Sequence, residues 1–474
     1  MKRYLRPIFE SANSARHRIR FFVALMASSI IAVSLLVGCM GIRTEGEKRM
    51  RQDQETVERI YRPGGKRPVL PNLDTNTTLH ELLLFAMLNE PQVEAAYYDW
   101  AVSVQRITME RSLPDPRLTF QSDIADMVIS LMPGLMMDFP GPGKLKAAAN
   151  VATAESEAKY FVFESTVLQT AFALKKAYYQ LNFLDAKISV IQKTLRLMDE
   201  LEKLALIQNE VGKVTLQDVL QARIEQERLF TNIANLNDFR QPLLAQFKAS
   251  LGLKDEDITP PVPHQIGTTP IDLTTEMVFT TALARNPRLK AIEAEVRIAE
   301  ASLRLATKMK VPDFTAGIEA DVKDSPLMVR PLFGVTLPIW RDKISAQIAG
   351  AQADKHAAEA RLSAEQIALA VELAEKSFML REASRNLELL HDRLLTMARQ
   401  SLEVAQSGYI GGKVDFLNVI DAERMLLDFQ LSEVEARLQR ELALAELSIL
   451  ILGAPPLNAP VLPSGVASEK EKKP

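Results

Sequence analysis

Apolar residues recur at alternating steps of three and four over two long stretches of the chain. Residues 144–210 contain no proline or glycine, and residues 343–409 repeat the same apolar pattern. The apolar positions are Leu174, Ala177, Leu181, Leu184, Ile188, Ile191, Leu195 and Met198 in the first stretch, and Leu380, Ala383, Leu387, Leu390, Leu394 and Met397 in the second. This spacing is typical of a coiled-coil seam. The sequence therefore predicts two helices of about 65 residues, each ~100 Å long.

Each predicted long helix ends in the same short motif. Residues 210–223 read EVGKVTLQDVLQAR and residues 410–423 read IGGKVDFLNVIDAE, so that Gly-Lys-Val at 212–214 returns at 412–414. Glycine adopts the left-handed conformation that ends many helices, and we expect a shorter helix to return beyond each turn. The motif therefore predicts two helical hairpins with tips near residues 212 and 412.

Other segments are also repeated along the chain. LNEPQVEAA (88–96) corresponds to ARNPRLKAI (284–292), and LPDPRLTF (113–120) corresponds to VPDFTAGI (311–318). Self-similarity over this length predicts a tandem duplication. The predicted organisation is a signal peptide (1–38), a lead-in segment without strong periodicity (39–76), a first repeat (77–257), a Pro-rich linker (258–272), a second repeat (273–453) and a disordered tail (454–474).

Strict alternation of apolar and polar residues predicts two β-hairpins, at about 117–139 and 313–340. In DFTAGIEADV (313–322) the apolar residues share one face, and RLTFQSDI behaves likewise, with PGLMMDF (133–139) and PLFGVTLPI (331–339) as their partners. This pattern fits transmembrane barrel strands that are apolar toward lipid and polar toward a lumen. It also fits an amphipathic hairpin on a soluble core, but the hairpins lie where the long helices end, and no further element is available to cover them. Four strands cannot close a membrane barrel, because the smallest need about eight, so several chains must share one.

The N-terminus predicts export and lipidation. Three arginines precede the apolar run FFVALMASSIIAVSLLVG, which stops at Cys39, the single cysteine. Leu36-Val37-Gly38-Cys39 resembles a bacterial lipobox, in which the cysteine is acylated and becomes the mature N-terminus. The alternative is a transmembrane anchor, since such a run could nearly cross a ~30 Å bilayer.

Charge and chemistry narrow the function classes further. The net charge is −3, and removing the first 38 residues takes away six Lys/Arg and one Glu, which leaves a mature chain near −8 and disfavours nucleic acid as a partner. The five histidines are scattered without metal-ligand spacing, and no phosphate loop or nucleophile–base pair is present, so we expect neither an enzyme nor a bound cofactor. The methionines Met127, Met132, Met136 and Met137 suggest either a soft-metal relay or flexible apolar packing, which we favour.

Duplicated strand and helical hairpins, an N-P or E-P helix pair and a lipobox together resemble the outer-membrane efflux protein (TolC) family over about residues 72–453. The resemblance implies a mainly α chain with a small β part, in which three chains form a twelve-stranded β-barrel in the outer membrane and an α-barrel in the periplasm. Met40 after the cysteine implies outer-membrane sorting by resemblance. The segment MDFPGPGKLKAAA (137–149) further resembles members that are paired with heavy-metal exporters.

The function implied by this resemblance is a passive exit duct for heavy metals or drugs. Its partners would be outer-membrane lipid, two further copies of the chain, a periplasmic adaptor and an inner-membrane pump of the RND or ABC class. Two alternatives stay open: the outer-membrane component of a type I protein secretion system, and a periplasmic adaptor or structural coiled-coil lipoprotein.

The family also implies roles for the tips. The adaptor-docking residues would be Gly212, Lys213, Val214, Thr215, Gly411, Gly412, Lys413, Val414 and Asp415. The alternative is that these turns are solvated loops in which Thr215 and Asp415 cap helices. A periplasmic gate would use a hydrogen bond between Asp218 and Tyr409, with Asp421 in an acidic ring; Val414 stands where the family has an arginine.

Overall fold

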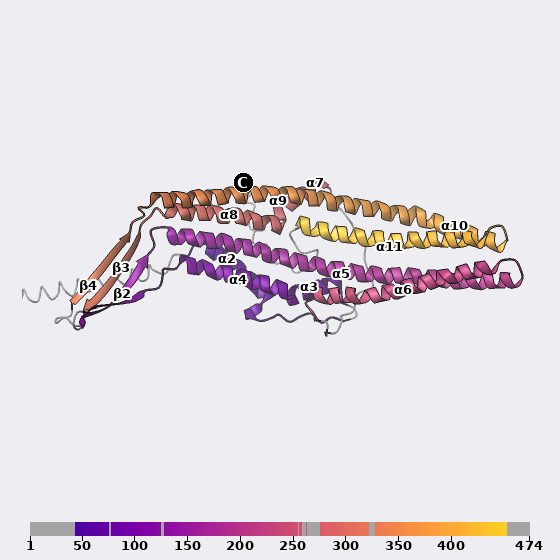
Figure 1. Ribbon diagram of the computed structural model, residues 1–474, viewed down its shortest axis with the longest axis horizontal. Helices are drawn as coiled ribbons and strands as arrows, with labels where there is room; N and C mark the ends of the chain where they lie inside the picture. The colour runs from indigo at the N-terminus through magenta and orange to yellow at the C-terminus, as the bar shows by residue number, and fades with distance from the viewer. Residues whose placement is uncertain are drawn as a thin grey trace, which may run out of the picture. The chain divides into compact units, whose positions relative to one another are not determined.

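The computed structural model describes residues 43–74, 77–124, 128–254, 256–257, 262, 275–321 and 328–452. Within them the chain is mainly helical and holds one four-stranded antiparallel sheet, as the fold class predicted (Figure 1). The signal peptide, Cys39, Met127, most of the Pro-rich linker and all of the tail lie outside the described residues.

The same order of elements occurs twice along the chain. The first series is α3 (Leu79–Asn89), α4 (Pro91–Arg111), β1 (Arg117–Ile124), β2 (Val128–Phe139), α5 (Lys144–Glu210) and α6 (Leu216–Ser250). The second series is α7 (Thr275–Arg285), α8 (Pro287–Lys308), β3 (Asp313–Asp321), β4 (Met328–Thr336), α9 (Arg341–Leu389), η2 (Leu390–Leu394), α10 (Leu395–Ile410) and α11 (Phe416–Leu452). Before both comes α2 (Glu45–Tyr61), followed by the short turn η1 (Pro63–Gly65).

The chain divides into two compact units. Unit 1 comprises residues 1–52, 101–157 and 294–359 and contains the sheet with the adjoining parts of five helices. Unit 2 comprises residues 53–100, 158–293 and 360–474 and contains both helical tips. None of the described helices holds an eighteen-residue stretch apolar enough to cross a bilayer.

The sheet of unit 1 runs in the order β1-β2-β3-β4, so β1 and β4 are its edges. Leu118 faces Leu135 across the first pair, and Phe314 faces Val335 across the last. The predicted alternation is observed: one face exposes apolar side chains, whereas Glu319 and Asp321 on the other are buried within the chain. The exposed apolar residues are Leu118, Phe120, Leu131, Leu135, Phe314, Ile318, Val329, Phe333 and Val335.

The strand ends differ from the sequence prediction. β2 begins at Val128 rather than at residue 133, because Pro133 lies inside the strand opposite Phe120 instead of starting it. β4 ends at Thr336 rather than near residue 340. Pro338 has no backbone N–H to donate to a neighbouring strand, which fits this early end.

The predicted helix over 144–210 is observed with those bounds as α5. Seven of its eight predicted seam positions are buried, and the eighth, Leu195, packs against the same core. In unit 2 an asparagine joins each pair of short helices to the end of a returning helix. Asn89 donates from Nδ2 to the carbonyl of Leu251 at 2.9 Å, and Asn286 donates likewise to Leu450 at 3.3 Å.

The second long helix is not continuous, contrary to the sequence prediction. Residues 390–394 form a π-helical turn, η2, which inserts one extra residue into the helical repeat. The buried seam therefore moves from Leu390 to Leu395, Ala398 and Leu402, and the predicted seam residue Met397 is 62% exposed.

The lead-in segment contains a well-packed helix that its weak periodicity did not predict. α2 buries Met50, Val57 and Tyr61. In unit 1 its Glu47 is fully buried, and the carboxylate lies 2.6 Å from Nε of Arg111 on α4. The segment is therefore tied to the folded body.

Candidate functional site: the two helical tips

Both tips close with a glycine in the left-handed region. Gly212 has φ +74° and Gly412 has φ +69°, whereas a Cβ atom built on either would meet nothing within 4 Å. The next amide bonds back across the turn in each case, from Lys213 to the Gln208 carbonyl at 2.9 Å and from Lys413 to Gly408 at 2.8 Å. These are Schellman turns, so glycine is needed for backbone conformation and not for close packing.

The repeated valines of the tips pack in or against a hydrophobic core. Val219 and Val419 are buried in the core of the tips, and Val214 and Val414 pack against its edge. Lys213 and Lys413 are exposed. Of the repeated residues, the two lysines are those that the structure of the chain does not require.

Helix capping does not account for Thr215. It occupies the N-cap position of α6, but its side chain makes no capping hydrogen bond. Asp218 instead accepts a hydrogen bond from the Thr215 backbone N–H. Asp415 precedes α11 and is exposed. Thr215 is exposed and has no capping role, so its side chain is available to contact a partner protein.

One hydrophobic core joins the two tips within unit 2. From the first hairpin it takes Met198, Leu201, Ala205, Val219 and Ala222, and from the second it takes Leu402, Tyr409, Phe416, Val419 and Ile420. The structure thus brings the two sets of predicted docking residues onto one end of the same packed body.

Tyr409 is buried in this core, with its ring 5.1 Å from that of Phe416. Burial, with a smaller contribution from the negative charge of Asp218, raises the pKa of Tyr409 to about 12. Burial and the charge of Asp415 also raise the pKa of Asp218. Among the described residues the Tyr409 hydroxyl has no hydrogen-bond partner. The implied bond to Asp218 is therefore not formed within this chain, although the two groups are close enough to interact electrostatically.

Asp421 is exposed, and a cation lies beside it that the sequence analysis missed. Nη1 of Arg424 is 3.8 Å from Oδ1 of Asp421. The same guanidinium also forms an ion pair with Glu225 of α6, a residue only 7% exposed. Because Glu225 belongs to the first hairpin and Arg424 to the second, this pair connects the two.

Glu225 is held in its charged form. Its burial raises the pKa, but hydrogen bonds from Arg424 and from Arg228, the latter at 3.0 Å, outweigh this and leave the pKa below its usual value. Glu225 and Arg424 lie at nearly equivalent places beyond Gly212 and Gly412. A comparison of the two returning helices for opposite charges could have found them.

Glu423 is the second acid that the sequence analysis missed. It is 4% exposed, and burial raises its pKa to about 7, opposed by a hydrogen bond with Thr194 on α5. Its other oxygen has no partner among the described residues. The tip core thus contains a carboxyl group that is easily protonated.

The surroundings of Met132, one of the four methionines, favour packing over metal binding. Met132 is buried in the sheet, and its sulfur accepts a hydrogen bond from Nη1 of Arg330 at 3.4 Å. A cation beside the sulfur disfavours a second one there. Across the described residues, no three His, Cys, Asp or Glu side chains are grouped to hold a metal ion.

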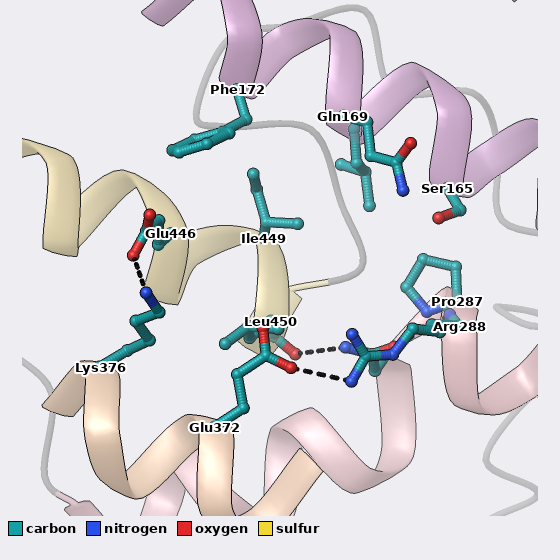
Figure 2. Close-up of a pocket in the computed structure, with 12 residues that line it drawn as sticks. Ser165, Gln169, Phe172, Pro287, Arg288, Glu372, Lys376, Glu446, Ile449 and Leu450 are labelled. Carbon is teal, nitrogen blue, oxygen red and sulfur yellow. Dashed lines mark hydrogen bonds and ion pairs between the residues drawn. The ribbon is translucent and has the colours of Figure 1, made fainter. Parts of the chain in front are cut away.

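A cavity of about 270 Å³ lies elsewhere in unit 2, between α5, α8, α9 and the end of α11 (Figure 2). Its charged residues bind one another: Arg288 lies 2.8 Å from Glu372, and Lys376 lies 2.7 Å from Glu446. Ser165 and Gln169 face the cavity from α5. The residues that line it include no histidine or cysteine. These pairs serve to join helices, and the tips remain the stronger candidate for a functional surface.

Comparison with known proteins matches most of the chain to one family. The sequence model of the family described as "Outer membrane efflux protein" matches residues 86–253 and 278–453. The cobalt-zinc-cadmium resistance protein CzcC of Cupriavidus metallidurans is 27% identical over 229 residues, which are 45% of this chain and 51% of that protein. The chain thus matches about half the length of this curated relative.

Solved structures share the fold at low sequence identity. The outer membrane protein VceC of Vibrio cholerae has a TM-score of 0.66 and 18% identity, covering 79% of this chain and 96% of that one. The open state of the MtrE outer membrane channel of Neisseria gonorrhoeae has a TM-score of 0.66 and 16% identity, covering 83% and 97%.

Proposed function

The chain belongs to the outer membrane efflux protein family, and from this premise we propose that it is the outer-membrane channel of a tripartite efflux system. The observation that carries the proposal is the sheet of unit 1, which exposes a row of apolar side chains on one face. Such a face suits hydrocarbon, and the polar face suits a water-filled lumen.

The assembly is a homotrimer. The edges β1 and β4 carry backbone groups that must be paired in a bilayer, where water is not available to them. Four strands close no barrel, but three copies supply twelve, with β4 of one chain beside β1 of the next. As the family implies, three chains paired in this way would form a twelve-stranded barrel, and their helices would form a tunnel.

Cys39 carries the lipid anchor. Acylation at its sulfur holds the mature chain on the outer membrane, in addition to the barrel strands. Cys39→Ser should abolish incorporation of labelled palmitate while leaving folded trimer in the membrane. Label retained in that variant would refute the assignment.

The cargo is selected by the inner-membrane pump. The name of CzcC refers to cobalt, zinc and cadmium resistance, so we propose divalent heavy-metal cations as the first cargo to test, ahead of drugs. Growth of a deletion strain in zinc, cobalt, cadmium and drugs separates these classes, and a defect confined to a secreted protein would favour type I secretion.

The tips dock a periplasmic adaptor and hold the gate residues. The exposed Lys213 and Lys413 are the best probes, since Gly412 needs its positive φ and Val414 packs against the core, so that changes there would disturb folding. Lys213→Glu with Lys413→Glu should leave trimer and bilayer conductance intact but abolish export and adaptor pull-down.

The matched control is Lys193→Glu, which changes an exposed lysine of α5 about 30 Å from the tip. It should leave export unchanged. Loss of conductance in the double variant, or export equal to wild type with adaptor still bound, would overturn the docking assignment.

A further inference from the structure

An apolar groove lies in unit 1 between the end of α4, the start of α5 and the end of α8. Its volume is about 660 Å³. The apolar lining residues are Met109, Leu113, Pro114, Leu145, Leu305 and Met309. Met109 and Met309 are exposed. Methionine side chains adapt their shape to irregular apolar ligands, so this surface suits a flexible hydrocarbon.

Charges around the groove are largely neutralised. Lys144 lines it, but its Nζ lies 2.7 Å from Oδ1 of Asp313. Glu110 lies 3.7 Å from Arg106, and Asp115 is an exposed residue before β1. The groove is therefore not built to bind an ion.

α2 directs the N-terminal chain toward this groove. It runs antiparallel to α4 within unit 1 (Figure 1): Glu47 contacts Arg111 at 2.6 Å and Thr108 at 2.9 Å, whereas Arg51 contacts Thr108 at 2.5 Å and Gln105 at 3.3 Å. The N-terminal end of α2 thus lies beside the C-terminal end of α4. Residues 43–46 therefore lie toward the C-terminal end of α4, which lines the groove.

Few residues separate Cys39 from α2. The described residues begin at Arg43. Cys39 lies four residues earlier, which an extended chain spans in at most ~14 Å. Glu47, fully buried against Arg111, holds the start of α2 beside the end of α4.

We propose that an acyl chain carried by Cys39 lies in the groove between α4, α5 and α8. This inference rests on the proposed lipidation of Cys39 and goes beyond it, because it assigns the lipid a protein binding site beside the start of β1. An acyl chain held there covers apolar surface of the helix–strand junction, and the anchor becomes a part of the folded unit.

Photocrosslinking tests the proposal. A benzophenone amino acid replaces Met109 in full-length protein, in cells fed an alkynyl palmitate, and crosslinked peptides are identified by mass spectrometry. The matched control is Val102, which is similarly exposed (68% against 73%) and lies two helical turns away on the same face of α4, outside the groove. We expect the Cys39 lipopeptide to be joined to position 109 at least about tenfold more than to position 102.

Two variants sharpen the test. Met309→Lys should lower the yield at position 109 several-fold, because it places a charge in the groove, and Thr307→Lys on the exposed surface of α8 should not. Equal yields at positions 109 and 102, or phospholipid in place of the lipopeptide at position 109, would overturn the proposal. Palmitate label without the crosslink would refute the groove site but not the anchor, whereas absence of label from the wild-type protein would refute both.

Discussion

The ion pair between Glu225 and Arg424 is expected to hold the two helical hairpins together at their tips. We change Arg424 to Gln, which keeps a polar side chain but removes the guanidinium that reaches Glu225. Glu225 then keeps only Arg228, a cation from its own helix. The link between hairpins is lost, while the link within the first hairpin stays.

The magnitude follows from the burial of the two partners. A hydrogen bond to a charged group contributes about 1.5–3 kcal/mol, and the partial exposure of Arg424 argues for the lower end. A loss of about 1.4 kcal/mol raises the population of the open tip roughly tenfold. Amide hydrogen exchange at the ends of α6 and α11 should accelerate by that factor in the purified trimer, and single-channel openings should become more frequent.

A double-mutant cycle with Glu225→Gln isolates the pair. The control is Arg223→Gln, since Arg223 pairs with Glu202 at 2.7 Å inside the first hairpin and joins nothing to the second. A coupling energy below about 0.3 kcal/mol, or equal acceleration in the control, would show that the hairpins are joined by the apolar core alone.

Two further predictions concern the buried groups of the tips. Burial raises the pKa of Glu423 to about 7 in the folded chain, against 4.5 for the free group. The buried charge therefore costs no folding stability below pH 4.5. The cost grows as the pH rises to 7 and is complete above it. Glu423→Gln should thus stabilise the tips by about 3 kcal/mol at pH 8 and by almost nothing at pH 4.5, and a hydrogen-exchange difference that does not vary with pH would contradict this. Tyr409→Phe should be at least as stable as the wild type in thermal unfolding, because the Tyr409 hydroxyl has no hydrogen-bond partner among the described residues; a loss of more than about 1 kcal/mol would mean that it binds a group such as Asp218 in the assembled channel.

The long helices and their turns could be predicted from sequence because one local signal determines each. In α5 the apolar repeat alone fixes the buried face, and the first glycine after it marks the turn at Gly212. The β-strands were located by alternation, but their ends depend on pairing. Pro133 was taken as a boundary and instead lies within β2, opposite Phe120 of β1.

The charged part of the site could not be predicted in the same way. Glu225 and Arg424 are far apart in sequence and meet only because the two hairpins share a core. A search for repeated motifs finds positions with the same residue type in both repeats, whereas an ion pair consists of residues of opposite charge.

The π-helical turn at residues 390–394 has an evolutionary consequence. An insertion into a regular helix rotates everything beyond it by about 100° per residue, which would point the Gly412 tip away from its neighbour. The π-helical turn accommodates one extra residue within a single widened helical turn, so that Leu395 takes the buried position that Leu394 would have held. The two series of elements can therefore differ in length while their tips keep a common orientation, and single-residue insertions and deletions in homologous chains should concentrate at this turn.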